Sequence, residues 1–311
     1  MRGGGAGPLK EALVAAGLRP RKALGQNFLV DERALGAIVE AAALGTDDVV
    51  LEIGPGPGIL TERLAGERRR VIACEIDEGL LSFARERLAD PRIEWVGGDA
   101  IDGRGHFGHG LEDALRRAIA KPKDEGDAIA PNWKLVSNLP YGISVPAVLL
   151  SLAFSPPPER AVVTVQREVG DRFRAGPGSR DYGAVSVIAR LMADVTVVRK
   201  LSPSSFWPAP KVHSVVLRFL PRSTGDRNCA TEKDFQFFVK ACFSERRKQL
   251  APLLHVRSEG RIPAVAISEQ LASCGHITRS RADALPPAFF VHLYRTIWQP
   301  MICGGADGPS I

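Results

Sequence analysis

The chain has 311 residues, of which 45% are hydrophobic and 24% charged, and its formal net charge is +6 at neutral pH. This composition is that of an ordinary globular protein, and no apolar run reaches the roughly 18 residues needed to span a bilayer. The moderate positive excess is compatible with a polyanionic partner such as nucleic acid, and equally with a mildly basic enzyme that has none.

The N-terminal part of the chain predicts a flexible leader over residues 1–18. Residues 1–8 are rich in glycine, and a short helix over residues 9–16 is expected to end at Gly17. A basic, turn-rich segment follows over residues 19–29. Asp31 then has the position of an N-cap for a helix that carries Leu35, Ile38 and Val39 on one face.

From residue 48 onward, predicted strands and helices alternate. Strands are expected at residues 49–53, 71–74, 93–96, 134–137 and 161–165, with helices at 59–64 and 80–88 between the first of them. This alternation predicts an α/β fold with a doubly wound, mostly parallel sheet. Strands at 195–198 and 214–219 are expected to add an antiparallel edge. Residues 102–132 interrupt the rhythm and predict an enlarged surface connection around one helix at 111–120.

After residue 222 the composition changes, and no further strand pattern is found. A polar linker begins at residue 223, and residues 235–254 have helical periodicity. We therefore expect one large α/β domain over residues 19–222 and a small helical domain over residues 223–311.

Cysteine and histidine usage indicates no metal site. The five cysteines are widely spaced without a CxxC pair, and the six histidines form neither HxxxH nor HExxH. The odd number of cysteines also argues against a disulfide framework and for a reducing compartment. Since no secretory signal is evident, we expect a cytoplasmic protein without metal or membrane partners.

A glycine-rich loop follows the first strand of the alternating region. Gly54, Gly56 and Gly58 stand between that strand and a helix, where glycine lets a ligand approach the backbone closely. Glu75 ends the next strand, at about the spacing of the acidic residue in dinucleotide sites. The pattern fits an NAD-type cofactor or another adenosine-containing cofactor, and also a tight turn that binds nothing.

Polar residues end the following strands as well. Glu75 is placed to accept hydrogen bonds from both ribose hydroxyls, and Asp99 from an exocyclic amino group such as that of adenine. At the end of the strand at 134–137 stands the tetrapeptide Asn138-Leu139-Pro140-Tyr141. Because ligands of open α/β sheets bind at the carboxyl ends of the strands, these residues predict one nucleoside-binding site.

Nine segments, in order, resemble the ribosomal RNA adenine N6,N6-dimethyltransferases, which use S-adenosylmethionine. The resemblance runs from about residue 22 to residue 293. The segments are LGQNFL (24–29), EIGPG (52–56), EID (75–77), GDA (98–100), NLPY (138–141), VQREV (165–169), PGSRDYG (177–183), FWPAPKV (206–212) and FSERRK (243–248).

The resemblance implies a Rossmann-like, S-adenosylmethionine-dependent methyltransferase domain with a mostly parallel seven-stranded sheet, followed by a small α-helical domain that binds RNA. It also implies roles for individual residues. Cofactor contacts would come from Gln26, Asn27, Leu29, Gly54, Gly56, Glu75, Ile76, Asp99, Ala100 and Asn138. The target adenine would lie against the catalytic residues Asn138, Leu139, Pro140, Tyr141 and Phe206.

The implied reaction is dimethylation of N6 on two adjacent adenosines near the 3′ end of small-subunit ribosomal RNA. Acceptors from Asn138 and from the Leu139 or Pro140 carbonyl would favour a pyramidal N6 nitrogen, and Tyr141 and Phe206 would stack on the base. The expected partner is the small ribosomal subunit, the expected oligomeric state is a monomer, and no metal is needed. RNA phosphates would be bound by Arg21, Lys22, Lys211, Arg246, Arg247 and Lys248.

Two alternatives on the same fold remain open: a large-subunit RNA methylase of the macrolide-resistance type and a non-catalytic assembly factor. A third alternative, based only on the general Rossmann-like pattern, is an NAD-linked oxidoreductase. The chain also departs from the family pattern: Gly142 and Val145 replace the usual Asn and Thr after the tetrapeptide, and His213 replaces an Asp.

Overall fold

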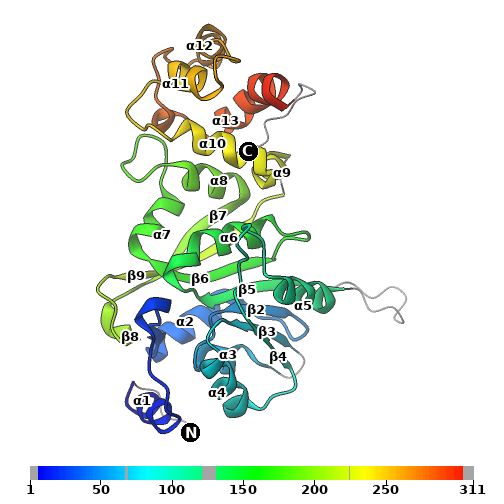
Figure 1. The fold of residues 1–311 in the computed structure, drawn as a ribbon, viewed down its shortest axis with the longest axis vertical. Coiled ribbons are helices and arrows are strands. Elements are labelled where there is room, and N and C mark those ends of the chain that lie inside the picture. The colour runs from blue at the N-terminus through cyan, green and yellow to red at the C-terminus, as the bar shows by residue number, and fades with distance from the viewer. Residues whose placement is uncertain (1–5, 67–68, 121–130, 224, 304–311) are drawn as a thin grey trace. The chain divides into compact units, whose positions relative to one another are not determined.

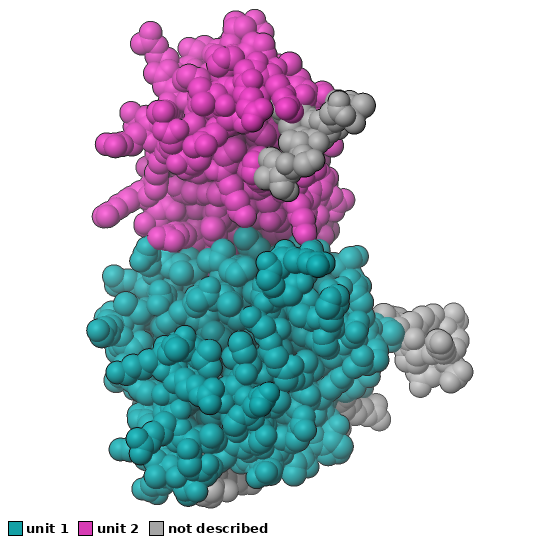
Figure 2. All heavy atoms as spheres, viewed as in Figure 1, with its two compact units in different colours: residues 1–170, 196–221 teal, residues 171–195, 222–311 magenta. Residues whose placement is uncertain are grey.

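The computed structural model describes residues 6–66, 69–120, 131–223 and 225–303. The glycine-rich start of the predicted leader, residues 1–5, and residues 121–130 of the predicted connection lie outside them. The chain divides into two compact units, coloured separately in Figure 2. Unit 1 contains residues 1–170 and 196–221, and unit 2 contains residues 171–195 and 222–311. The domain boundaries expected above, at residues 18 and 222, stay predictions.

A seven-stranded sheet with the strand order β4-β3-β2-β5-β6-β9-β7 forms the centre of the fold (Figure 1). Parallel pairing joins β4 to β3, β3 to β2, β2 to β5 and β5 to β6, whereas β9 runs antiparallel to β6. The expected α/β class and the antiparallel addition are therefore confirmed. The strands are β2 (Val49–Ile53), β3 (Arg70–Glu75), β4 (Ile93–Gly97), β5 (Trp133–Asn138), β6 (Arg160–Gln166), β7 (Ala193–Leu201) and β9 (Ser214–Pro221).

The chain reverses its direction across the sheet beside β2. It runs outward from β2 through β3 to β4, and then returns to form β5 on the other side of β2. Ser137 Oγ donates a 2.6 Å hydrogen bond to the Ile53 carbonyl and ties the ends of β5 and β2 together. Such a switch point opens a crevice at the carboxyl ends of the strands, which is where ligands of this fold class bind.

Helices cover the sheet, and their apolar faces form the core with the buried strands. In the α2 helix (Glu32–Ala42), Leu35 and Ile38 are buried as the periodicity predicts, and Val39 is half-buried against the same core. Asp31 is its N-cap, since its carboxylate accepts from the Arg33 and Ala34 amides. The other helices of unit 1 are α1 (Ala6–Ala15), α3 (Ile59–Leu64), α4 (Glu78–Leu88), α5 (His109–Ile119), α6 (Ser144–Ala153) and the start of α7 (Arg167–Arg174).

A second, two-stranded sheet in unit 1 has no counterpart in the sequence predictions. The short strands β1 (Phe28–Leu29) and β8 (Phe206–Trp207) pair antiparallel, with Leu29 opposite Phe206. Leu13 of α1 packs into a small cluster with Phe28 and Leu80. The N-terminal segment is thereby attached to the rest of unit 1 through β1.

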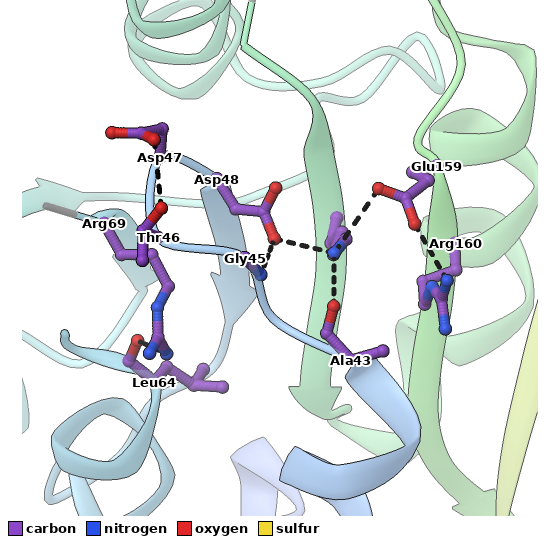
Figure 3. A network of polar contacts seen from close by, with 10 residues as sticks. Ala43, Gly45, Thr46, Asp47, Asp48, Leu64, Arg69, Glu159 and Arg160 are labelled. Atoms are coloured by element: carbon purple, nitrogen blue, oxygen red, sulfur yellow. Dashed lines mark hydrogen bonds and ion pairs between the residues drawn. The ribbon is translucent and has the colours of Figure 1, made fainter.

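A buried lysine lies near the amino ends of the central strands β2 and β5, and Figure 3 labels its partners Ala43, Asp48 and Glu159. Lys134 is only 1% exposed. Its Nζ donates to the Ala43 carbonyl at 2.7 Å and to Asp48 Oδ2 at 2.6 Å, and it lies 3.4 Å from Glu159 Oε2. An ammonium group has three donors, so these three acceptors satisfy it. Burial without them would be costly.

Unit 2 contains helices around an aromatic core, as expected for the end of the chain. The rings of Phe235, Phe238, Tyr294 and Trp298 contact one another at centroid distances of 5.1–6.2 Å. Its helices are the end of α7, α8 (Ala184–Met192), α9 (Gly225–Thr231), α10 (Lys233–Cys242), α11 (Leu250–Arg257), α12 (Ala264–Ser273), α13 (Pro287–Leu293) and a π-helix (Tyr294–Cys303). Within the described part of the chain, no helix is both long enough and apolar enough to cross a membrane.

Candidate active site

A cavity of about 390 Å³ opens in unit 1 at the carboxyl ends of β2, β3, β4 and β5. Its walls come from the loops after these four strands and from residues 22–28. The size is within the roughly 300–1,000 Å³ of small-molecule sites. The cavity therefore lies at the switch point, where the sequence predicted a nucleoside-binding site.

The loop after β2 comes close to its neighbours because it contains glycine. Gly54 and Gly56 have φ angles of +71° and +56°, which L side chains rarely adopt. A Cβ at Gly54 would lie 2.8 Å from Pro140 Cγ, and one at Gly56 would lie 2.8 Å from Phe28 Cε1. Both glycines line the cavity. Alanine at either position would displace one of the cavity walls.

Glu75, at the end of β3, is a buried carboxylate in the cavity wall. Its Oε2 accepts from the Gly56 amide at 2.9 Å, and its Oε1 accepts from the Asp77 amide at 3.0 Å. Burial raises the pKa of Glu75, and these amide donors oppose the rise. Each oxygen retains a lone pair for a further donor. Beside it, the apolar side chain of Ile76 is 48% exposed and lines the cavity.

Asp77 connects the segment at residues 21–27 to the start of α4. Its Oδ1 accepts from the Gly79 and Leu80 amides as the N-cap of α4, and its Oδ2 accepts from Gln26 Nε2 at 3.0 Å. Arg21 adds an ion pair at 3.3 Å, and its amide donates to Gln26 Oε1. Sequence reasoning gave Asp77 no role, although an Asp just before a helix is an N-cap signal.

The loop after β4 supplies Asp99, which is exposed to solvent and lines the cavity. Its Oδ1 accepts from the Ile101 amide at 3.1 Å, and Ala100 beside it is buried in the wall. Cys74 also lines the cavity, and burial raises the pKa of its thiol to about 12, with the nearby Glu75 and Asp99 charges adding to the rise. The thiol is therefore protonated at neutral pH.

The tetrapeptide forms the side of the cavity beyond β5. Asn138 Nδ2 donates to the Asn27 carbonyl at 3.1 Å. Its Oδ1 is buried, and no described protein atom donates to it. The Pro140 carbonyl accepts from the Ile143 amide at 3.2 Å. An amide held through its nitrogen, with its oxygen unpaired, is an acceptor ready for a donor on a ligand.

The ring of Tyr141 is held by the backbone at one end and by a hydrogen bond of its hydroxyl at the other. Its backbone continues the loop, and its hydroxyl shares a 2.8 Å hydrogen bond with Ser214 Oγ at the start of β9. Burial raises the pKa of the phenol, so it stays neutral. Half-buried and lining the cavity, the ring offers a flat surface for stacking.

Two predicted site residues do not line this cavity. Leu29 and Phe206 face each other in the β1–β8 pair, are 3% and 4% exposed, and belong to the hydrophobic core of unit 1. Phe28, which the sequence analysis left without a role, lines the cavity instead. Its ring lies 6.2 Å from that of Trp207. All other predicted cofactor and catalytic residues line the cavity.

The predicted RNA-binding residues lie in both units. Lys22 lines the cavity, and Lys211 is exposed in unit 1. In unit 2, Arg246 donates to the Ser179 carbonyl and Lys248 pairs with Glu245, whereas Arg247 is exposed. No group of three or more His, Cys, Asp or Glu side chains suited to a metal ion occurs in the residues that the structure describes.

Comparison with known proteins links this site to a family. A family profile described as ribosomal RNA adenine dimethylase matches residues 17–283. The chain is 40% identical to the ribosomal RNA small subunit methyltransferase A of Geobacter metallireducens over 290 residues, which is 93% of this chain and 98% of the relative. It is 39% identical to the protein of that name from Acidobacterium capsulatum, over 96% of this chain and 99% of the relative.

Solved structures agree with the sequence matches. A dimethyladenosine transferase from Plasmodium falciparum superimposes with a TM-score of 0.66 at 25% identity, covering 86% of this chain and 96% of that one. The 23S rRNA methyltransferase ErmE gives a TM-score of 0.58 at 26% identity, covering 86% of this chain and 98% of that one. ErmE is named for the 23S ribosomal RNA, whereas the relatives from Geobacter metallireducens and Acidobacterium capsulatum are named for the small subunit, so the choice of RNA needs further argument.

Proposed function

The chain belongs to the ribosomal RNA adenine dimethylase family, and on this premise we propose that it is an S-adenosylmethionine-dependent methyltransferase of small-subunit ribosomal RNA. It dimethylates N6 of two adjacent adenosines near the 3′ end of that RNA. The observation that carries this proposal is that Glu75, Asp99 and the tetrapeptide from Asn138 to Tyr141 line one cavity.

The cavity residues fit S-adenosylmethionine. Glu75 Oε1 and Oε2 each have a lone pair left for a ribose hydroxyl, Ile76 offers an apolar surface for the adenine ring, and Asp99 is an acceptor for its amino group. The bound cofactor supplies a methyl group on a positively charged sulfur that leaves as a thioether. Gln26 and Asn27 cover the end of the cavity that would hold the methionine part of the cofactor. Hydrogen bonds with Asp77 and Asn138 hold these two residues in place.

The tetrapeptide prepares the target amine. The N6 lone pair of adenine is delocalised into the ring, so the nitrogen is a poor nucleophile. Asn138 Oδ1 and the Leu139 carbonyl accept from the two N6 hydrogens and favour a pyramidal nitrogen whose lone pair is localised. The Pro140 carbonyl is less suited, because the Ile143 amide already donates to it. The nitrogen loses one proton to solvent with each methyl group that it gains.

Tyr141 holds the base in place. Stacking of a base on an aromatic ring is worth about 1–3 kcal/mol, and the bond to Ser214 keeps this ring in one orientation. Catalysis by alignment of the reacting atoms needs such a fixed surface. Since the target base must leave its own stack to enter, unpaired or loop adenosines are the favoured substrates.

The small-subunit RNA is favoured over the large-subunit RNA by the full-length relatives. The relatives described above share their name and cover nearly the whole chain at 39–40% identity, whereas ErmE is 26% identical. We also propose that the protein is cytoplasmic and acts as a monomer on the small subunit. Lys22, Lys211 and the basic run at 246–248 then bind RNA phosphates, and residues 223–311 form the RNA-binding domain.

A methylation assay tests the proposed function. Small subunits that lack the modification are incubated with the protein and labelled S-adenosylmethionine, and the digested RNA is analysed for modified nucleosides. Dimethyladenosine at two adjacent positions near the 3′ end is the expected product. Large-subunit RNA is the matched control. Methylation of that RNA alone would favour the macrolide-resistance type, and no product on either RNA would refute the proposal.

A further inference from the structure

Unit 1 contains a second, much smaller cavity of about 20 Å³. This cavity is lined by Glu52 of β2 and Asn138 at the end of β5, together with apolar atoms of Phe28, Leu29 and Leu60 and the loop at residues 54–57. A water molecule needs roughly 10–15 Å³ of such space and at least two polar partners. The cavity has room for one water and none for a larger ligand.

Two of the residues that line this cavity each have a buried oxygen without a partner among the described residues. These oxygens are Glu52 Oε2, on a side chain that is 1% exposed, and Asn138 Oδ1. The Thr61 hydroxyl of α3 approaches the Glu52 carboxyl closely enough to influence it, without reaching hydrogen-bond geometry. Buried polar atoms are rarely left unpaired. One water between the two oxygens would pair both.

The protonation of Glu52 decides the direction of the hydrogen bonds. Burial raises the pKa of Glu52 to about 8, the Thr61 hydroxyl opposes the rise, and the Glu75 charge adds to it. At neutral pH the carboxyl is therefore mostly protonated and can donate, whereas an ionised carboxylate accepts only. Thr61 on α3 and Glu75 at the end of β3 influence the carboxyl, and Asn138 at the end of β5 lines the same cavity.

We propose that Glu52 is a positioning residue that fixes the orientation of the Asn138 amide through one water in this cavity. The neutral carboxyl donates to the water, and the water donates to Asn138 Oδ1, which keeps a second lone pair for the target amine. The inference rests on the proposed function.

Two contacts then specify which end of the amide is oxygen. The Asn27 carbonyl requires the NH₂ end, and the Glu52–water pair requires the oxygen end. If Glu52 is ionised or removed, no contact at the oxygen end of the Asn138 amide opposes its rotation by 180°. The rotated amide would present a donor to the N6 hydrogens, which are donors themselves, and the transfer would slow.

The test compares Glu52→Gln with Glu52→Leu. Glutamine is isosteric, cannot ionise and still has N–H donors, whereas leucine removes the polar group at similar size. Ser151→Ala, which removes a buried hydroxyl bonded to the Ala147 carbonyl of α6, controls for general effects of a buried change. Turnover on small subunits is measured from pH 6.5 to 9.5, and cofactor affinity by calorimetry.

For E52L we expect kcat to fall at least about tenfold, as for other losses of catalytic alignment, with cofactor affinity unchanged. E52Q should recover most of that loss at pH 7. The wild-type rate should decline as the pH rises through about 8, and E52Q should lack this decline.

Two results would overturn the inference: wild-type kcat in E52L, or an alkaline decline that is the same in E52Q and the wild type. The pH dependence of turnover in E52Q tests the proposed role of Glu52 even if E52L fails to fold. The proposed function fails separately, through absence of dimethyladenosine with the wild type.

Discussion

The side-chain amide of Asn138 donates to the backbone carbonyl of Asn27, 3.1 Å away and 111 residues earlier in the chain. Under the proposed function, Asn27 belongs to the segment that covers the cofactor, and Asn138 belongs to the tetrapeptide that receives the target base; both residues line the same cavity. This hydrogen bond therefore joins the proposed target end of the site to the proposed cofactor end.

Removal of the Asn138 amide should slow transfer strongly and weaken cofactor binding far less, because the bond from Gln26 to Asp77 still holds the covering segment. Asn138→Ala deletes an acceptor aimed at the reacting nitrogen, and loss of one such group in other enzymes costs roughly 100-fold or more in rate. Single-turnover kinetics on small subunits measures the rate, and calorimetry measures cofactor affinity. Lost affinity with normal turnover would show that Asn138 does not act on the target amine.

Cofactor affinity should weaken at low pH because of Glu75. Only the ionised carboxylate accepts two hydroxyl donors, and burial raises its pKa. Affinity should therefore fall as the pH is lowered through that raised value. Glu75→Gln should bind about tenfold or more weakly, as expected for lost hydrogen bonds to a charged group. The cofactor affinity of Glu75→Gln should not change with pH over this range. If the variant keeps the pH dependence of the wild type, a group other than Glu75 causes it.

The sign for folding stability is opposite to that for cofactor affinity. A carboxyl whose pKa is raised in the folded state stabilises the fold most fully below its unfolded pKa, and this contribution is lost as the pH rises through the folded pKa. Glu75→Gln should therefore unfold at higher denaturant concentration than the wild type at pH 8 and show less difference at pH 4. Denaturant titrations at the two pH values measure this.

Asp77 and Asp31 form a matched pair of helix N-caps that separate folding from function. Replacing either with Ala should cost about 1 kcal/mol of stability. Asp77→Ala should also weaken cofactor binding, because it releases Gln26 and Arg21, whereas Asp31→Ala should not. Chemical denaturation and calorimetry on the two variants test this. Equal affinities in both would mean that the Gln26 contact does not hold the covering segment.

Tyr141→Ala should weaken use of the RNA by roughly 5- to 150-fold in kcat/KM, which corresponds to the stacking energy of one base. Tyr141→Phe keeps the ring and loses only the bond to Ser214. It should match Ser214→Ala, and both should lie close to the wild type. If Tyr141→Phe were as damaging as Tyr141→Ala, the hydroxyl and not the ring face would carry the role.

Lys134→Met should destabilise unit 1 without altering the active site. Removing one partner of a buried ion pair typically costs about 3–5 kcal/mol, because the other charge is left buried. The additional change Asp48→Asn should recover part of this loss, since Asp48 is the closest acidic partner. Denaturant titration measures the stability, and methylation at low temperature is the control. An unchanged stability of Lys134→Met would show that solvent reaches the ion pair.

By itself, the sequence determined the order of strands and helices that builds the sheet, and it predicted which residues gather at the carboxyl ends of the strands. Strand periodicity and the polar residues that follow each strand are local features, and in a parallel sheet the strand ends necessarily meet at one edge. This is why Gly54, Glu75, Asp99 and Asn138 were predicted together and line one cavity.

Only the tertiary structure decided which neighbouring side chains face that cavity. Along an extended segment successive side chains point to opposite sides, so the sequence QNFL cannot say whether Phe28 or Leu29 faces the ligand. The answer came from pairing with Phe206 and Trp207 far along the chain, which put Leu29 and Phe206 into the core and Phe28 at the cavity. The contacts of Asp77, Lys134 and Asn27 are likewise long-range, and no local pattern encodes them.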